Sequence, residues 1–501
     1  MVAFISFLFS NGFLLLISFV ICLFLLDFVK SRKNGSRLPP GPKGIPFLGN
    51  TLQVDFKNPA ETVRQLRKEF GDVFSFQYFY KKLVVLNGFE MMKEALINKA
   101  EDIADRPQLP IFEKVGYAGD TKGISVARYG SSWKEQKRFA LTTLRNFGMG
   151  KKSLEERVTE EAQWLRSVFR SQKGHFNPQL HIHNAVSNVI CSIAFGDRFD
   201  YDDAKFQHLI SLFDVALKSK HGFLYQVLNE IPILLNIPWL VNRALRLEHE
   251  VIKFLREMVL EHKKNWNPND IRDFIDAYLA EMEKVKEDSG SSFTEGNLLM
   301  TTYDLFVGGT ETTSTTLRWA LLYMILYPDV QSKVQKEIDE VIGGERKPTM
   351  GDVLQMPYTN AVVHEVQRCA DIIPFSMPHM TYRDMEINGY IIPKGTTVIT
   401  NLSSVLKDQQ LWEKPFQFYP KHFLDENGKF IKREAFMPFS AGRRACVGEQ
   451  LARMELFLFF TTLLQQLTFE IPNDQPRPRE EPLYGFTLSP HPFNICAVAR
   501  G

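Results

Sequence analysis

The chain of 501 residues carries 60 lysines and arginines against 58 acidic residues, a formal net charge of +2, and 44% of its residues are apolar. This composition is typical of a globular protein with a sizeable core, and it excludes disordered, collagen-like and coiled-coil chains. The near-neutral charge argues against a dedicated nucleic-acid binder, and five cysteines exclude a disulfide scaffold and indicate a reducing compartment.

The first segment predicts a membrane anchor. No charged residue occurs in residues 1–26, and about 20 apolar residues suffice to span a bilayer as a helix. Four basic residues follow between positions 30 and 37, which favours the cytosolic side for the remainder of the chain. A cleaved secretory signal fits less well, because no basic segment precedes the apolar run and no small-residue cleavage site ends it. We therefore expect a transmembrane helix over residues 1–29 and a basic, proline-rich linker over residues 30–49.

The remaining residues, 50–501, predict one large domain that is mainly α with small β-sheets. Apolar and aromatic runs predict a strand pair over residues 74–86, around Lys81-Lys82, and helical periodicity dominates residues 90–370. The charged stretch 267–292 predicts short helices and an exposed loop. β-branched residues and turn signals then predict short strands over residues 387–402.

The segment from Phe439 to Gly448 is the most informative, because it places Cys446 among two glycines and two arginines before an amphipathic stretch. A cysteine at a helix N-terminus beside cations has its thiolate favoured, and a thiolate is a good iron ligand. The spacing Phe-x-x-Gly-x-Arg-x-Cys-x-Gly resembles the haem-thiolate signature of the cytochrome P450 family, and every position is matched. The resemblance implies the cytochrome P450 fold, with Cys446 as the ligand of the iron in haem b.

A second segment, from Asp304 to Thr313, places glycines, an acid and alcohols within an apolar helix. Asp304, Gly308 and Thr312 are four residues apart and therefore share one face. The run resembles the oxygen-binding helix of the family, which implies that Glu311 and Thr312 deliver protons during dioxygen activation. An ordinary kinked core helix is the alternative interpretation.

Other matched positions imply structural and haem contacts. Glu365 and Arg368 resemble the Glu-x-x-Arg pair of the family, and the apolar residues that flank them predict burial. His422 stands where many members have an arginine, so we expect an ion pair with an added polar contact. Lys137 replaces another arginine and provides a point charge in place of a planar fork. The positions that match haem-contacting segments are Arg106, Trp133, Lys137, His379 and Arg444.

The anchor, the Pro-Pro-Gly-Pro hinge and several internal segments look most like vertebrate microsomal family 2, subfamily 2D. The resemblance implies a pocket for lipophilic substrates that is lined by Ile124, Phe223, Asp304, Gly308, Ile373, Met377 and Phe486. In that subfamily an acid at the position of Asp304 recognises amines, but Lys220 here replaces a second acid of the pocket. Asp304 either recognises amines or contacts backbone N–H groups as a structural residue, and the sequence leaves both roles open.

The resemblance as a whole implies a monooxygenase that inserts one atom of O2 into lipophilic substrates such as amines, drug-like compounds, steroids or fatty acids. Its electrons would come from NADPH through cytochrome P450 reductase, with cytochrome b5 as a second candidate partner and no nucleic acid involved. It implies the endoplasmic reticulum membrane, with the catalytic domain on the cytosolic side. The basic residues that could dock an acidic partner are Lys134, Arg138, Arg145, Lys151 and Lys152. The alternatives are a haem-thiolate isomerase or dehydratase of peroxides without a reductase, and a non-catalytic membrane haem protein.

Overall fold

The computed structural model describes residues 38–500, except residues 47, 57, 80, 120, 148–151, 220–222 and 289. The predicted anchor over residues 1–29, Lys151 and Lys220 lie outside the described residues. No helix within the described part of the chain has both the length and the apolar character needed to cross a bilayer. The described residues form two compact units, which we call the sheet unit and the helical unit. The sheet unit comprises the chain up to Pro107 together with Phe375–Ser404, and the helical unit comprises Gln108–Pro374 and the residues from Val405 onward.

The sheet unit contains a four-stranded sheet in the order β1-β2-β7-β4, in which β1 and β2 are antiparallel and β2 and β7 are parallel. Phe74 and Val85 face one another across β1 and β2 and form a small core. The predicted strand pair is confirmed, but its turn lies earlier than expected, because Phe79 has a φ of 50° and β2 already begins at Lys81. The short strands predicted over residues 387–402 are confirmed as well. The elements of the sheet unit are η1 (Thr51–Gln53), α2 (Pro59–Phe70), β1 (Val73–Tyr78), β2 (Lys81–Leu86), α3 (Phe89–Lys93), η2 (Glu94–Asn98), β4 (His379–Met380), β5 (Met385–Ile387), β6 (Tyr390–Ile392) and β7 (Thr397–Thr400). The first two residues of α15 (Ser403–Leu406) also belong to this unit.

The helical unit holds most of the helices and one continuous hydrophobic core. Two small sheets accompany them, in the orders β3-β11-β8 and β10-β9. The mainly α architecture predicted from the periodicity is therefore confirmed. The helices and turns are α4 (Pro110–Val115), α5 (Ser131–Asn146), α6 (Lys152–Ser171), α7 (Gln179–Ala194), α8 (Ala204–Ser219), α9 (Phe223–Glu230), η3 (Pro232–Asn236), α10 (Pro238–Asn265), α11 (Phe274–Lys284), α12 (Glu295–Leu326), α13 (Pro328–Val341), η4 (Met350–Gln355), α14 (Pro357–Ala370), η5 (Pro420–Phe423), η6 (Gly442–Arg444) and α16 (Glu449–Gln466). The strands are β3 (His175–Phe176), β8 (Leu467–Glu470), β9 (Pro482–Tyr484), β10 (Leu488–Pro490) and β11 (Ile495–Ala499).

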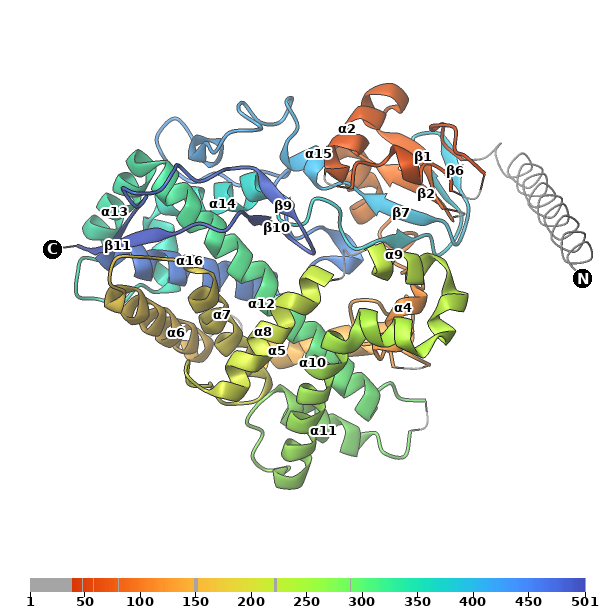
Figure 1. Ribbon diagram of the computed structural model, residues 1–501, viewed down its shortest axis with the longest axis horizontal. Helices are drawn as coiled ribbons and strands as arrows, with labels where there is room; N and C mark the ends of the chain where they lie inside the picture. Colours follow the sequence, from red (N-terminus) through yellow and green to blue (C-terminus); the bar gives the residue numbers. More distant parts are fainter. Residues whose placement is uncertain are drawn as a thin grey trace, which may run out of the picture. The chain divides into compact units, whose positions relative to one another are not determined.

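The long helix α12 is the centre of this unit, and it packs against α7, α10, α14 and α16 (Figure 1). Thr294 caps its start, since the Thr294 side chain accepts a hydrogen bond from Asn297 N at 3.1 Å. The helix runs without a break through Gly308 and Gly309. The neighbouring α16 differs from its prediction: it is not amphipathic, because every residue from Met454 to Gln465 is buried. Its burial follows from its position between α12 and α6.

Candidate functional site

The segment that carries Cys446 is a tight loop that ends at the N-terminus of α16. Ser440 and Gly442 both adopt left-handed backbone conformations, with φ of 59° and 73°, so glycine is the residue best suited to the second position. Cys446 N donates a hydrogen bond to Phe439 O at 3.0 Å and closes the loop. Cys446 is thus held three residues before α16 begins at Glu449.

Cys446 is exposed, yet neighbouring protein atoms desolvate its thiol. This desolvation is the largest influence and raises the pKa of Cys446, whereas the backbone N–H of Gly448 and the charge of Lys137 act to lower it. Desolvation thus opposes the influence that the helix N-terminus and the nearby cation have on this thiol. A coordinated iron would supply the missing positive charge and deprotonate the thiol.

Trp133 lies beside the Cys446 loop with cations around its indole ring. The guanidinium of Arg444 is 4.0 Å from the ring centroid and Lys137 Nζ is 5.3 Å from it. Lys137 Nζ also donates to Arg443 O, which links α5 to the loop. Trp133 Nε1 is buried and has no hydrogen-bond partner among the described residues. A buried donor without a partner is costly, and two neighbouring cations suit an anion, so these residues fit the propionate edge of a haem.

Two other predicted haem contacts belong to the sheet unit. Arg106 is buried and donates from one guanidinium nitrogen to Met377 O at 2.6 Å and Pro378 O at 3.0 Å. Burial lowers the pKa of Arg106 to about 10. His379 is buried on β4, with Nδ1 2.9 Å from Ile103 O. Their approach to Cys446 stays a prediction, whereas their anchoring within the sheet unit is defined.

The middle of α12 exposes one face in an otherwise buried stretch. A Cβ atom built on Gly308 would meet no heavy atom within 4 Å, whereas one on Gly309 would lie 2.2 Å from Ile190 on α7. Gly309 therefore permits close packing of α7, and Gly308 leaves room for a ligand. Thr312 Oγ1 donates to Gly308 O at 2.7 Å, so its hydroxyl lies on the same face of α12 as Gly308.

Glu311 is held by one hydroxyl of α12 and by one from the segment before β10. Its Oε1 accepts hydrogen bonds from Thr487 at 2.7 Å and Thr315 at 3.3 Å. Burial is the main influence on the Glu311 carboxyl and raises its pKa. Among the hydrogen bonds between described residues, none joins Glu311 to Thr312. The two predicted proton-delivering residues are neighbours in sequence but have separate partners.

Asp304 is fully engaged by the irregular segment that precedes α5. Its Oδ1 accepts from Tyr117 Oη at 2.6 Å and from Ser125 Oγ. Its Oδ2 accepts from Ile124 N at 2.7 Å and Ser125 N at 3.1 Å. Asn297, two turns earlier on α12, accepts from the backbone N–H of Lys122 at 2.8 Å. Four donors use the acceptor capacity of Asp304, so the contacts favour the structural role over the amine-recognising one.

The remaining predicted pocket residues are distributed between the two units. Ile124 is buried, and Arg444 donates to its carbonyl oxygen at 3.3 Å. Ile373 and Phe486 lie on adjacent segments, since Leu488 N donates to Ile372 O at 2.8 Å. Phe223 begins α9, but its side chain lies outside the described structure, and Met377 belongs to the sheet unit.

Glu365 and Arg368 on α14 form an ion pair whose side chains are both 0% exposed. Two hydrogen bonds of 2.7 Å join them, and Arg368 also donates to three backbone carbonyls. His422 Nδ1 lies 3.2 Å from both Glu365 oxygens, and Lys414 N donates to His422 Nε2 at 3.1 Å. Because Nε2 accepts, the imidazole is neutral and Nδ1 is the donor to Glu365. The arrangement is an ion pair with a neutral polar contact, as the sequence predicted.

Sequence reasoning missed Glu455, a carboxyl that is fully buried on α16. Burial raises the pKa of Glu455 to about 8, with Thr313 of α12 acting in the opposite direction. It also missed the contact between His364 and Arg453, in which the Arg453 guanidinium lies 2.9 Å from His364 Nε2 and 5.2 Å from the Phe439 ring. Their residue types gave no signal, because glutamate and histidine on helices are usually solvated.

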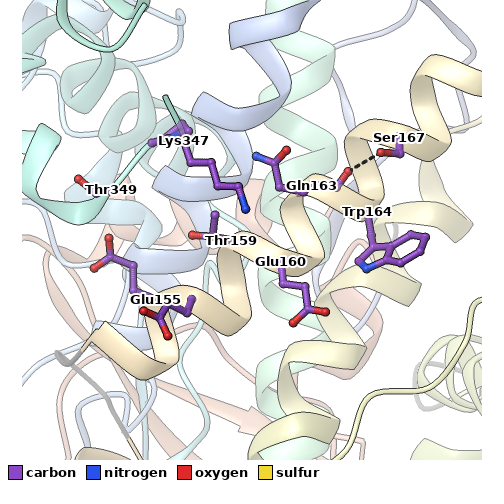
Figure 2. A pocket seen from close by; sticks show the side chains of 10 residues that line it. Glu155, Thr159, Glu160, Gln163, Trp164, Ser167, Lys347 and Thr349 are labelled. Atoms are coloured by element: carbon purple, nitrogen blue, oxygen red, sulfur yellow. Dashed lines mark hydrogen bonds between the residues drawn. The ribbon is translucent and has the colours of Figure 1, made fainter. Parts of the chain in front are cut away.

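A surface groove of about 410 Å³ runs along α6 and faces Lys347–Thr349 (Figure 2). Glu155, Glu160 and Trp164 are among its lining residues. None of the residues predicted to bind cofactor or substrate lines this groove, so it is separate from the site around Cys446.

Comparison with known protein families matches residues 39–497 to the family described as Cytochrome P450. The chain is 53% identical over 483 residues to Cytochrome P450 2D6 of Homo sapiens. The aligned residues cover 96% of this chain and 97% of that protein. It is 52% identical over 489 residues to Cytochrome P450 2D15 of Canis lupus familiaris and, over the same length, to Cytochrome P450 2D14 of Bos taurus. Each of these matches covers 97% of this chain and 98% of the relative.

Proposed function

Because the chain belongs to the cytochrome P450 family and is a haem-thiolate monooxygenase of the 2D-like group, we propose that Cys446 is its iron ligand and that it oxidises lipophilic, drug-like substrates. Bound haem supplies the activation of O2, with electrons that derive from NADPH. The observation that carries the assignment is the closed loop around Cys446 beside the indole N–H of Trp133, which no described residue accepts.

Turnover with NADPH and cytochrome P450 reductase tests this function against the peroxide isomerase. We expect a lipophilic substrate to be hydroxylated only when NADPH, reductase and O2 are all present. Rearrangement of an organic peroxide without reductase, together with no reductase-dependent product, would overturn the proposal in favour of the isomerase. The non-catalytic alternative predicts that no lipophilic compound perturbs the haem spectrum.

The residues of this chain have distinct tasks in the proposed mechanism. Trp133, Lys137 and Arg444 would bind the propionates and orient the haem, and Arg106 and His379 are proposed as further haem contacts. Thr312 holds a proton at Oγ1 on the open face of α12. Glu311, whose pKa is raised by burial, stores a proton at its carboxyl. To pass that proton on, Glu311 leaves Thr487 and turns toward Thr312.

Substituting Thr312 with alanine should uncouple the reaction, because the hydroxyl that holds the proton is removed. We expect product formed per NADPH to fall by about tenfold or more, with peroxide released in its place. Parallel assays of NADPH, peroxide and product measure the change. Thr316 is the matched control, since its hydroxyl makes the same backbone bond to Thr312 O one turn later. Tight coupling in Thr312→Ala would refute the assigned role.

The proposed substrates are lipophilic compounds that do not depend on an ionic contact with Asp304. The carboxylate of Asp304 already holds the segment that contains Ile124, which we propose as a pocket wall. The other residues that we propose to line the pocket are Phe223, Gly308, Ile373, Met377 and Phe486.

The variant Asp304→Asn should leave amine binding nearly intact. One amide oxygen can still accept from the Ile124 and Ser125 N–H groups, while the amide NH2 can donate to the Tyr117 and Ser125 hydroxyls. We expect the Kd of an amine and of its neutral isostere to change by the same small factor in spectral titrations. Asp304→Ala should cost about 1–3 kcal/mol of stability through the unpaired N–H groups. A selective tenfold loss of amine affinity in the asparagine variant would restore the amine-recognising role.

The proposed partner is cytochrome P450 reductase, with cytochrome b5 as a second electron donor. Three exposed basic residues of α5, Lys134, Arg138 and Arg145, lie at positions that share a helix face and would meet an acidic surface. Lys152 begins α6, but its side chain, like Lys151, is outside the described structure. The apolar segment over residues 1–29 supports a proposed anchor in the endoplasmic reticulum membrane, with the catalytic domain in the cytosol.

A further inference from the structure

A buried histidine of α7 lies next to the acid of α12. His183 Nε2 is 3.8 Å from Glu311 Oε2, and the two side chains are 3% and 12% exposed. Helices α7 and α12 pack directly against each other, so the pair is set by the helix interface and not by mobile loops. Two ionisable groups that are buried to this extent interact strongly when charged, because little water screens the electrostatic interaction between them.

The two oxygens of Glu311 have different environments. Oε1 accepts the hydroxyl protons of Thr487 and Thr315, and this holds the carboxyl in place. Oε2 is the oxygen that faces His183. A proton that arrives from α7 would therefore bind at Oε2 without disturbing the contacts at Oε1.

In its proposed role, Glu311 needs a source of protons, because its burial restricts contact with solvent. A carboxyl that gives up a proton in each turnover must recover one, but its enclosed position limits direct exchange with solvent. Imidazole can donate from one nitrogen and accept at the other near neutral pH. A gap of 3.8 Å is closed by a small side-chain rotation or by one bridging water.

Two charged groups, on α8 and on α12, act on the carboxyl of Glu311. Asp214 on α8 raises the pKa of Glu311, and Arg318 on α12 lowers it. Asp214 is half-buried and accepts from Gln179 Nε2 on α7 at 3.3 Å. Asp214 is thus a half-buried carboxylate of α8 that contacts α7 and acts on the charge of Glu311.

We propose that His183 supplies protons to Glu311: its imidazolium passes the Nε2 proton to Glu311 Oε2, and Nε2 of the neutral ring then takes a proton from a solvent hydronium ion when the ring turns away from Glu311. In this step the N–H bond of the imidazolium breaks and the O–H bond of the carboxyl forms, so charge and protons balance without an added reactant. The inference rests on the proposed function of Glu311 as a proton store. His183 acts through Glu311 and touches neither substrate nor haem.

The first test measures the carboxyl itself and not activity. Infrared difference spectra across a pH series, with Glu311→Gln identifying the band, give the pH at which Glu311 ionises. Loss of an imidazolium next to a carboxylate should raise that pH, so His183→Phe is expected to shift the midpoint upward by about one to three units. His183→Gln, which stays polar, guards against misfolding and should show the same shift. His181, half-buried on α7 against the Phe169 ring, is the control, and His181→Gln should leave the midpoint unchanged. An unchanged midpoint in both His183 variants would overturn the inference.

The second test separates this inference from the proposed function. In the wild type, product per NADPH should fall as the pH rises through the titration of His183, because the imidazolium that refills Glu311 is lost. In His183→Gln the ratio should be low and independent of pH over that window. If Glu311→Gln is uncoupled but His183→Gln behaves as the wild type, only the role of His183 is wrong. If Glu311→Gln itself stays coupled, the proton-storing function fails, and the inference fails with it.

Discussion

Replacing Cys446 with alanine should abolish the thiolate-type absorption of the reduced carbonyl complex and reduce monooxygenase turnover to background. The iron would lose its strong anionic ligand, and alanine offers no donor atom in its place. The spectrum of the reduced protein with carbon monoxide measures the first effect, and NADPH-dependent product formation measures the second.

Other thiols of the helical unit should not replace Cys446. Cys191 is fully buried, and burial raises the pKa of its thiol far above the ordinary value. Cys369 likewise has a pKa raised by burial. Cys369→Ala is the matched control and should keep the thiolate-type spectrum. Survival of that spectrum in Cys446→Ala would show that the ligand has been misassigned.

Replacing Glu365 with glutamine should destabilise the protein by about 3–5 kcal/mol. The change leaves the Arg368 guanidinium charged in a fully buried site without a counter-charge, because the amide of glutamine and the backbone carbonyls are neutral acceptors. Since the whole stability of a domain is commonly about 5–15 kcal/mol, this is a large share. Thermal unfolding followed by circular dichroism, with haem absorbance recorded in parallel, measures the effect.

The chain contains a pair of the same spacing that serves as a control. Glu61 and Arg64 are also separated by three residues on a helix, but their side chains are 35% and 48% exposed. An exposed pair contributes only about 0–1 kcal/mol, so Glu61→Gln should barely move the unfolding temperature. Equal effects of the two substitutions would contradict the buried-pair interpretation.

The sequence predicted those features that depend on local pattern. Apolar and aromatic runs located β1 and β2, helical periodicity indicated the helices of residues 90–370, and apolar neighbours indicated the burial of Glu365 and Arg368. Each of these signals lies within a few residues of the feature that it predicts. The assignment of the family followed from a motif of fixed spacing around Cys446, which needs no knowledge of tertiary contacts.

Features that depend on distant segments could not be predicted in this way. The contact between His183 and Glu311 joins two helices that are far apart in the chain, and no local pattern marks it. Burial of α16 between two helices replaced the expected amphipathic pattern. The desolvation that raises the pKa of Cys446 was also not predictable, because the sequence shows neighbouring charges but not the packing around the thiol.

The hydrogen bonds that side chains make to the backbone of the segment from Lys122 to Ala127 have a consequence for hydrogen exchange. Asp304 and Asn297 accept from its backbone N–H groups, and Arg444 donates to its carbonyls at Ile124 and Ala127. The amides of an irregular loop normally exchange within seconds, whereas these are bonded to side chains of a buried helix. Deuterium labelling should therefore find slowly exchanging amides in this segment, and their exchange rates should follow the local opening of α12.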